Sequence, residues 1–347
     1  MEKIAFLDRD GVLIYEPPDT KQIDSIDKLQ ILPGAVSQLK SFILEGYKLV
    51  MVSNQNGIGT PSFPQKNFDA PQNELLNRLK KEGIEFEGIF ICPHFSEDNC
   101  NCRKPKTGLV DDFLRKNTID FNKSFMVGDR NTDMEFAKNI GIRAYLVKTN
   151  SSFPRIASLE RITNETNIFI QCNLDGKGEN QIKTGLNFFD HMLQQLSRHS
   201  LIDLIVRADG DLNVDEHHTV EDVGIALGEV LLKALGSRKG INRYGFLLPM
   251  DETLAEVALD LGGRSNLIFN VDFNREKVGD LPTELIEQFF KSLSDTLKAT
   301  IHINLRYGRN EHHKIEAIFK GFAKSLRQAC DTDERAQNIL PTTKGIL

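Results

Sequence analysis

The chain has 347 residues, long enough for two or three domains, because a single hydrophobic core stops growing at about 250 to 300 residues. It is 40% hydrophobic and 27% charged, with a net charge of -6 and no long block of like charge, which argues against binding to nucleic acid or an acidic membrane surface. Its first residues lack a signal-peptide pattern and no run approaches about 18 consecutive apolar residues, so we expect a cytoplasmic protein that does not enter a membrane.

The first part of the chain alternates strand-like and helical segments. Short, continuous apolar runs predict strands that are buried on both faces of a parallel sheet. These runs lie at 4–7, 48–53, 88–92, 124–128 and 143–147. Two segments, 35–46 and 73–83, have helical periodicity and end in glycine, a common C-cap. The alternation predicts a doubly wound α/β domain over 1–157.

A polar, proline-containing stretch at 149–158 predicts a linker, so a second domain is expected over 158–347. This part reads as strand pairs joined by Gly-Asp turns and followed by helices, which favours an α+β domain with antiparallel strands. The motif HHxxE occurs twice, at 217–221 and 312–316, and each copy opens a helix of similar length after an apolar strand. We therefore expect a duplicated half-domain.

Two carboxylates follow the first predicted strand in the segment FLDRDGV. Asp8 and Asp10 lie where loops at the carboxyl ends of an α/β sheet form ligand sites. Their spacing of two places both on one side of an extended loop. One carboxylate can attack phosphorus while the other handles the proton of the leaving group. Taken alone, the motif fits a helix cap or an Asp-Gly turn equally well.

Further polar residues follow the other predicted strands. Ser53 and Asn54 offer hydrogen-bond donors to a phosphate, and Lys104 offers a positive charge. Asp129 and Asp133 offer the oxygen ligands that Mg²⁺ prefers. In this order, the motifs resemble the haloacid dehalogenase superfamily of phosphatases. The resemblance implies Asp8 as nucleophile, Asp10 as general acid and base, Ser53 and Lys104 as phosphate ligands, and Mg²⁺ bound by Asp8, the Asp10 backbone and Asp129, supported by Asp133.

A cluster of thiols lies between the phosphatase motifs, in CPHFSEDNCNC. Three cysteines and one histidine have the spacing C-x-H-x5-C-x-C, and in a reducing compartment such a cluster indicates metal rather than disulfides. Three thiolates and one imidazole fill a tetrahedral zinc shell with no open position, which favours a structural role. The alternative is unpaired surface thiols. The four residues are Cys92, His94, Cys100 and Cys102.

The two HHxxE motifs place an imidazole and a carboxylate one turn apart. If each motif starts a helix, His217 and Glu221 share a face, as do His312 and Glu316. The second histidine of each pair then points about a quarter-turn away, so one motif can serve two metal centres. Mixed nitrogen and oxygen ligands suit Mn²⁺, Fe²⁺ or Zn²⁺, and six-coordinate shells favour Mn²⁺. The alternative is a solvated helix start.

The segments FFDHM, DEHHTVEDVGIALGE, RYGFLLPMDETLA, DLGGR, EHHKIEAIFKGFAKSLRQA and LPTTKGIL are similar to imidazoleglycerol-phosphate dehydratase over 158–347. That resemblance implies two Mn²⁺ ions per subunit, sites at subunit interfaces and a 24-mer. The implied metal ligands are His191, His217, His218, Glu221, His312, His313 and Glu316. The implied substrate contact is Glu165, and the implied phosphate ligands are Arg243, Arg264, Lys320, Thr342, Thr343 and Lys344.

Both resemblances together cover the whole chain and match the bacterial enzymes that fuse histidinol-phosphatase to imidazoleglycerol-phosphate dehydratase. Small phosphorylated imidazoles are then the expected substrates. In the dehydratase reaction a substrate imidazole held as imidazolate between two cations can expel the hydroxyl through a diazafulvene-like intermediate. The proton carrier is left open among Glu165, Glu221 and Glu316.

One position departs from the dehydratase pattern. The second repeat has Gln288 where the family has a histidine that corresponds to His191. An amide is a poorer ligand than imidazole for these metals, so we expect one of the two metal sites to be weakened.

An alternative interpretation also follows from this departure. The second domain would be a metal-dependent assembly module that displays an active phosphatase, possibly one for a sugar bisphosphate. The predicted phosphate ligands argue against it, because a purely structural metal domain needs none.

Overall fold

The computed structural model describes the chain except residues 334–335, 337–338 and 343–347. The chain forms two compact units, Met1–Pro154 and Arg155–Leu347. A boundary between 157 and 158 would fall inside strand β6 (Ile156–Ile162), so the division lies slightly earlier in the predicted linker. None of the described helices is both long and apolar enough to cross a membrane.

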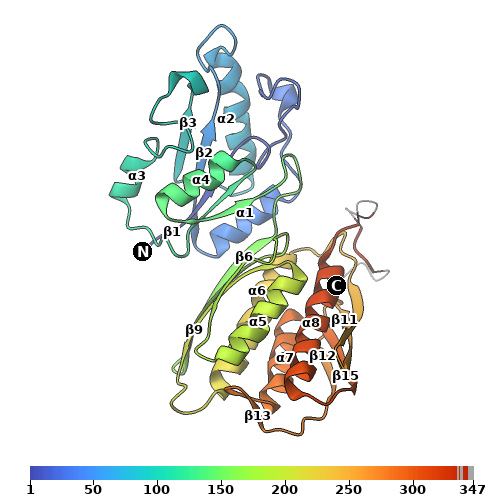
Figure 1. The fold of residues 1–347 in the computed structure, drawn as a ribbon. Helices are drawn as coiled ribbons and strands as arrows, with labels where there is room; N and C mark the ends of the chain where they lie inside the picture. Colours follow the sequence, from blue (N-terminus) through green and yellow to red (C-terminus); the bar gives the residue numbers. More distant parts are fainter. Residues whose placement is uncertain (334–335, 337–338, 343–347) are drawn as a thin grey trace. The chain divides into compact units, whose positions relative to one another are not determined.

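A five-stranded sheet forms the centre of the first unit (Figure 1). Its strand order is β3-β2-β1-β4-β5, and all neighbouring strands are parallel. The strands are β1 Lys3–Leu7, β2 Tyr47–Asn54, β3 Gly88–Cys92, β4 Phe125–Gly128 and β5 Arg143–Leu146. The five predicted strands are confirmed. The order reverses beside β1, so the carboxyl ends of β1 and β4 flank the crevice where such sheets bind ligands.

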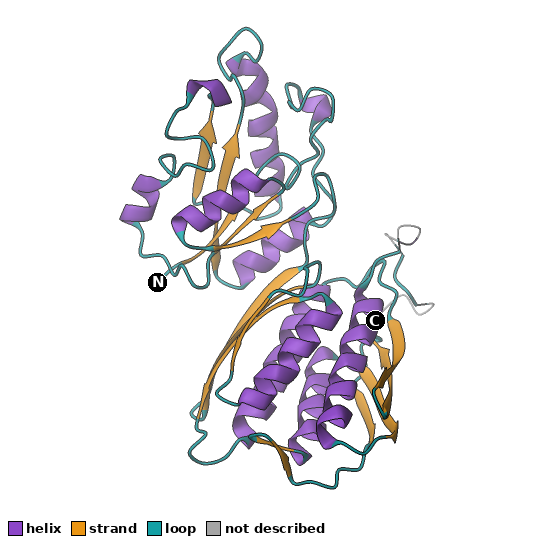
Figure 2. Cartoon of the chain, viewed as in Figure 1, coloured by secondary structure: helices purple, strands orange, loops and turns teal. Residues whose placement is uncertain are grey.

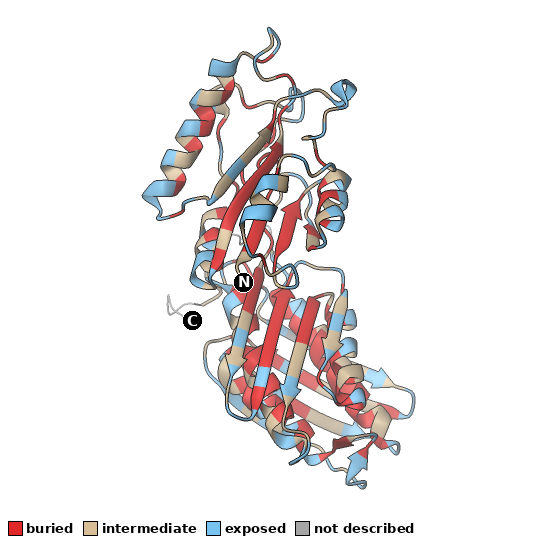
Figure 3. Cartoon of the chain, turned by 90° about the vertical axis from the view of Figure 1, so that its left-hand side faces the viewer, coloured by how far each residue is buried: buried red, intermediate tan, exposed pale blue. Residues whose placement is uncertain are grey.

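The helices of the first unit are α1 Ala35–Leu44, α2 Gln65–Lys81, α3 Asp111–Lys116 and α4 Asn131–Ile140, with short 3-10 turns η1 Ile26–Lys28 and η2 Ser96–Asp98. Aromatic side chains pack on both faces of the sheet. The ring of Phe6 meets Phe136 edge to face, and that of Phe125 meets Phe42 in the same way. Figure 3 shows buried residues along the central strands. Burial on both faces explains the continuous apolar runs of the sequence.

The second unit contains two four-stranded sheets with helices between them (Figure 2). The first sheet has the order β6-β7-β9-β8 and the second has the order β10-β11-β15-β12. The remaining strands are β7 Thr166–Asn173, β8 Asn180–Lys183, β9 Asp203–Gly210, β10 Tyr244–Met250, β11 Thr253–Asp260, β12 Asn266–Asn270 and β15 Thr300–Tyr307, with a small hairpin of β13 Lys277–Val278 and β14 Leu281–Pro282.

The helices of the second unit are α5 Asn187–Ser200, α6 His217–Leu235, α7 Glu284–Leu297 and α8 Glu311–Cys330. They share one core, in which the rings of Phe289, Phe290 and Phe319 lie 5.1 to 5.3 Å apart. Helix α6 approaches α7 closely at Gly228, where a Cβ atom would lie 2.7 Å from the Leu293 carbonyl oxygen. A residue without a side chain is therefore required there.

Candidate functional sites

The residues predicted for a phosphatase meet at the carboxyl edge of the first sheet. Asp8 follows β1, Ser53 lies near the end of β2, and Asp129 follows β4. Lys104 joins this edge from a loop: its Nζ lies 3.0 Å from Asp8 Oδ1 and 2.6 Å from Asp133 Oδ1. Lys104 is only 3% exposed. Burial opposes its charge, but the two carboxylates outweigh burial and raise the pKa of Lys104.

Three carboxylates at this edge can hold one cation. Oxygen atoms of Asp8, Asp129 and Asp133 all lie within 4.8 Å of one another. Burial raises the pKa of Asp129, and it raises that of Asp133 to about 6. The buried Oδ1 of Asp129 has no hydrogen-bond partner among the described residues. Crowded, buried carboxylates of this kind are stabilised by a hard divalent cation, so the residues fit Mg²⁺.

Asn54 has a different set of contacts from those expected of a phosphate donor. Its Nδ2 donates to the Lys104 carbonyl oxygen at 3.1 Å, and its Oδ1 accepts from the Lys104 backbone N–H at 3.0 Å. Both ends of the amide are thus occupied by the backbone of Lys104. These contacts favour a role for Asn54 in positioning Lys104 rather than in binding phosphate.

The carboxylate of Asp10 is held by two side chains that sequence reasoning missed. Arg9 Nη1 donates to Asp10 Oδ1 at 2.6 Å, and Gln55 Nε2 donates to Asp10 Oδ2. Gln55 Nε2 also lies 3.0 Å from Ser53 Oγ, which links the predicted general acid to the predicted phosphate ligand. Arg9 is fully buried and is itself fixed by Gln72 at 2.8 Å. The direction of Asp10 is therefore set by its neighbours.

We expect Gln55→Leu to lower the phosphatase kcat by about 10- to 100-fold with little change in KM, because a hydrogen bond to a charged group contributes about 1.5 to 3 kcal/mol. Steady-state kinetics check this. Gln30→Leu is the control, since Gln30 is an exposed glutamine of the same unit. In an Asp10→Asn background the loss of Gln55 should add little. A wild-type kcat for Gln55→Leu would contradict the positioning role.

The four side chains predicted to bind zinc come together. The sulfur of Cys92 lies 3.7 Å from Cys100 Sγ and 3.3 Å from Cys102 Sγ, and His94 Nδ1 lies 3.1 Å from Cys102 Sγ. A tetrahedral ion with bonds of about 2.3 Å separates its ligands by about 3.8 Å. Burial raises the pKa of the Cys92 thiol to about 12, so a cation is needed to hold it as a thiolate. The cluster fits a closed structural site.

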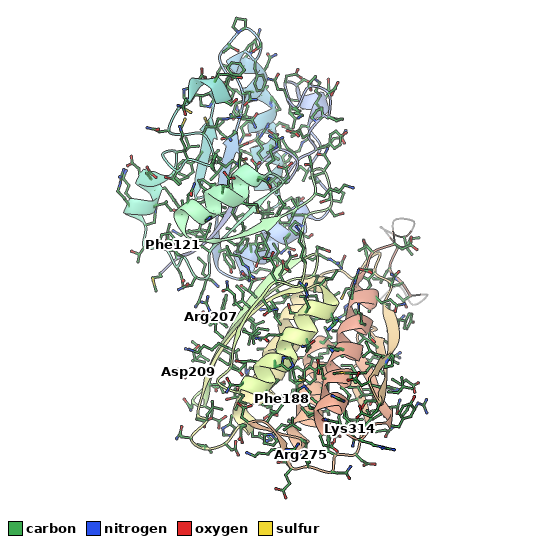
Figure 4. All side chains as sticks on the ribbon, in the orientation of Figure 1. Phe121, Phe188, Arg207, Asp209, Arg275 and Lys314 are labelled. Carbon is green, nitrogen blue, oxygen red and sulfur yellow. The ribbon has the colours of Figure 1, made fainter. Side chains whose placement is uncertain are left out.

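The four helices of the second unit begin at the same end. The ring of Phe188 on α5 meets that of His312 on α8 at 5.1 Å, and Gln288 on α7 contacts Glu221 on α6. Figure 4 shows Phe188 and Lys314 at this end. The beginnings of α5 and α8 are thereby brought together, and so are those of α6 and α7.

One group of three predicted ligands can reach a single ion. His191, His312 and Glu316 have ligand atoms within 4.8 Å of one another. His312 Nε2 lies 3.1 Å from Glu316 Oε2, and the rings of His191 and His312 are 5.8 Å apart. The other oxygen of Glu316 faces Lys320 Nζ at 2.8 Å. We call these three residues half-centre A.

The matching group on α6 and α7 contains Gln288, His217 and Glu221. Gln288 Nε2 donates to Glu221 Oε1 at 2.7 Å, and His217 Nε2 lies 3.5 Å from Glu221 Oε2. We call these three residues half-centre B. A cavity of about 620 Å³ opens beside His217 and is lined partly by Arg275 and Lys277, of which Figure 4 labels Arg275.

His218 and His313 do not join these groups and contact carboxylates elsewhere. His218 Nδ1 lies 3.1 Å from Asp211 and its Nε2 lies 3.7 Å from Glu165. His313 Nδ1 lies 2.8 Å from Glu252 Oε2. The hydrogen bond to Asp211 raises the pKa of His218, and the one to Glu252 raises that of His313. Within the chain, the two histidines of each pair therefore contact different groups of side chains.

Glu252 was not predicted from the sequence. It lies in the β10–β11 turn in the segment Asp251-Glu252-Thr253, as Glu165 lies in the β6–β7 turn in Asn164-Glu165-Thr166. The Glu-Thr pair after a polar residue occurs in both turns, and this repetition could have identified Glu252 from the sequence. Each turn thus supplies one carboxylate to one histidine.

The predicted phosphate ligands Arg243 and Lys320 contact different carboxylates. Arg243 Nη2 pairs with Asp260 at 2.8 Å and its Nη1 donates to the Pro341 carbonyl oxygen at 3.0 Å. Arg264 is exposed, and Lys320 faces half-centre A. Thr342 is described, whereas Thr343 and Lys344 lie outside the described residues.

Comparisons with known proteins find family matches in both units of the chain. Residues 184–326 match the imidazoleglycerol-phosphate dehydratase family model, and residues 101–166 match an HAD-hydrolase-like model. The chain is 46% identical to the histidine biosynthesis bifunctional protein HisB of Buchnera aphidicola, covering 100% of this chain and 99% of the relative. It is 47% identical to that of Actinobacillus pleuropneumoniae, covering 99% and 98%.

A solved structure of imidazoleglycerol-phosphate dehydratase from Staphylococcus aureus matches at 41% identity and a TM-score of 0.47, covering 51% of this chain and 99% of that one. The full-length matches alone are sufficient to assign the family. The chain therefore belongs to the bifunctional histidine biosynthesis proteins, which join an HAD-type phosphatase to an imidazoleglycerol-phosphate dehydratase.

Proposed function

We propose how the two activities of this bifunctional enzyme, histidinol-phosphatase and imidazoleglycerol-phosphate dehydratase, are distributed over the residues described above. The phosphatase belongs to the first unit and the dehydratase to the second. The observation that carries the phosphatase assignment is the buried contact of Lys104 with Asp8 and Asp133 beside the clamped Asp10. A cytoplasmic location is part of the proposal, because a metal-binding thiol cluster requires a reducing compartment.

In the phosphatase reaction, Asp8 attacks the phosphorus of histidinol phosphate and forms an aspartyl-phosphate. Asp10 gives a proton to the departing alcohol oxygen and then takes one from the attacking water, which releases phosphate and restores Asp8. Lys104 and Ser53 hold the phosphoryl oxygens. Mg²⁺, held by Asp8 and Asp129 with support from Asp133, supplies positive charge that offsets the charge on the phosphoryl group. The Arg9 and Gln55 contacts keep Asp10 oriented while the proton moves.

The thiol cluster is proposed as a structural Zn²⁺ site. Cys100→Ser should lower zinc affinity by at least about 100-fold and the melting temperature of the phosphatase unit by on the order of 5 °C. Metal analysis and calorimetry measure the two effects. Ser96→Ala, an exposed change in the same loop, should leave both unchanged. Full zinc content in Cys100→Ser would exclude this thiol as a ligand.

Histidinol phosphate is compared with a sugar bisphosphate as substrate of the phosphatase, because the catalytic residues of this superfamily accept many phosphate esters. We expect kcat/KM for histidinol phosphate to exceed that for heptose bisphosphate by at least about 100-fold. Parallel phosphate-release assays with Mg²⁺ give the ratio. A ratio below one would instead favour the sugar bisphosphatase interpretation.

The second unit is proposed to be a duplicated half-domain, and the first a doubly wound α/β domain. In β6-β7-β9-β8 the successive pairs are antiparallel, antiparallel and parallel. In β10-β11-β15-β12 they follow the same sequence. Each sheet is joined to two helices in the same chain order. Matching order, direction and ligand positions support duplication.

The dehydratase is proposed to use Mn²⁺ at half-centres A and B. His218 and His313 contact carboxylates apart from both, so we infer that copies of the chain supply them to one another's half-centres in an oligomer, proposed as a 24-mer. Mn²⁺ supplies Lewis acidity toward the substrate imidazole. Glu165, Glu221 and Glu316 are the candidates for moving the proton of the C–H bond, and Arg243, Arg264 and Lys320 are proposed to hold the phosphate. Thr342, Thr343 and Lys344 complete this phosphate set.

The alternative of a purely structural second unit is decided by one assay. Formation of imidazole acetol phosphate from imidazoleglycerol phosphate is measured with and without Mn²⁺. The proposed function requires Mn²⁺-dependent product formation. A correctly assembled protein that forms none would support the structural alternative.

A further inference from the structure

Half-centres A and B each combine one helix from each repeat, and their residues correspond to one another. Half-centre A combines His191 of α5 with the HHxxE motif that opens α8, and half-centre B combines Gln288 of α7 with the motif that opens α6. In each, a histidine and a glutamate one turn apart face a residue of a neighbouring helix. The two half-centres can therefore be compared within one chain. They differ in the residue from the neighbouring helix, which is His191 in half-centre A and Gln288 in half-centre B.

The chemistry of that residue is different in kind. An imidazole nitrogen of His191 lies within reach of an ion shared with His312 and Glu316. The Gln288 amide instead uses its nitrogen to donate to Glu221 at 2.7 Å, and an amide N–H cannot bind a cation. The Gln288 nitrogen, and not its oxygen, must face Glu221, because an ionised carboxylate can only accept hydrogen bonds. To bind an ion, half-centre B must break this hydrogen bond and turn the amide oxygen inward.

Each half-centre also has one glutamate oxygen engaged by an N–H donor. In half-centre A the donor is Lys320, which lies one turn beyond Glu316 and leaves Oε2 beside His312. Ile225 stands at the equivalent position of α6. In half-centre B the donor is Gln288 itself, at the position that should provide a ligand. Only half-centre B thus loses a ligand and gains a competing hydrogen bond through the same side chain.

We propose that the two half-centres are unequal, with half-centre A binding a divalent transition-metal cation tightly and half-centre B binding it at least about tenfold more weakly. Gln288 is the residue that sets the difference, because it holds Glu221 in a hydrogen bond. This inference rests on the proposed Mn²⁺-dependent dehydratase, and it adds that the two metal positions fill at different Mn²⁺ concentrations.

The test exchanges the two residues between the repeats, as Gln288→His and His191→Gln. Mn²⁺ binding to the full, assembled chain is followed by calorimetric titration, with zinc bound to the thiol cluster and excess Mg²⁺ present for the oxygen-only phosphatase centre. The wild type should show two classes of site that differ at least about tenfold in Kd. Gln288→His should merge them into one tight class, and His191→Gln should leave only weak sites.

The outcomes separate this inference from the proposed function. A single class of equal sites in the wild type, or unchanged binding in Gln288→His with its melting temperature preserved, would overturn the inference while leaving Mn²⁺ use intact. If Gln288→His fails to assemble, the assembled His191→Gln variant tests the inference. It should have lost the tight class of sites, and retention of that class would overturn the inference. Absence of Mn²⁺ binding in every protein overturns the Mn²⁺ proposal together with the inference.

Discussion

Replacing Asp8 by asparagine should reduce the phosphatase kcat by at least about 10⁴-fold, the scale seen when a covalent nucleophile is removed. An amide cannot form the phosphoenzyme bond. The fold should persist, because Lys104 keeps its contact with Asp133 at 2.6 Å after the charge of Asp8 is lost. Loss of the contact at 3.0 Å should cost about 1 to 3 kcal/mol in the free energy of unfolding.

Phosphate release from histidinol phosphate measures this change, and thermal denaturation measures its structural cost. The matched control is Asp112→Asn, an exposed aspartate on α3 that pairs with Arg115. Dehydratase turnover in Asp8→Asn should equal that of the wild type. Phosphatase turnover at the wild-type rate in a folded Asp8→Asn protein would remove Asp8 from its proposed role.

The fold was largely predictable where burial leaves a clear pattern. The central strands β1, β2 and β4 are largely buried and the edge strands β3 and β5 only partly, but a continuous apolar run marked each of the five. Helix α2 was placed too late, at 73, whereas it begins at Gln65. Its first two turns are mostly polar and contain Pro71, so periodicity and propensity both argued against a helix there. Pro71 is nevertheless buried in the helix, and tertiary packing overrides the local signal.

The sites were predictable where ligands lie close together in sequence. The thiol cluster and the His–Glu pairs one turn apart follow from spacing alone. The clamp on Asp10 was missed because Gln55 is distant in sequence and has no motif of its own. The division of the seven predicted metal ligands into separate groups also depends on which helices pack together, and spacing within a helix carries no information about its neighbour.

Replacing His312 by alanine should reduce dehydratase kcat/KM by at least about 10³-fold, since metal-ion catalysis contributes several kcal/mol and each 1.36 kcal/mol is tenfold. His312 contacts both Glu316 and the ring of His191, so its loss removes the central donor of half-centre A. His199→Ala is the control: this half-buried histidine of α5 bonds to Gln195 at 3.1 Å and belongs to neither half-centre. Phosphatase turnover should be unchanged in both variants. If His312 served only to hold the subunits together, its loss would change the particle size before it changed turnover, so sedimentation is measured alongside activity. An intact assembly with wild-type dehydratase activity in His312→Ala would exclude half-centre A from the reaction.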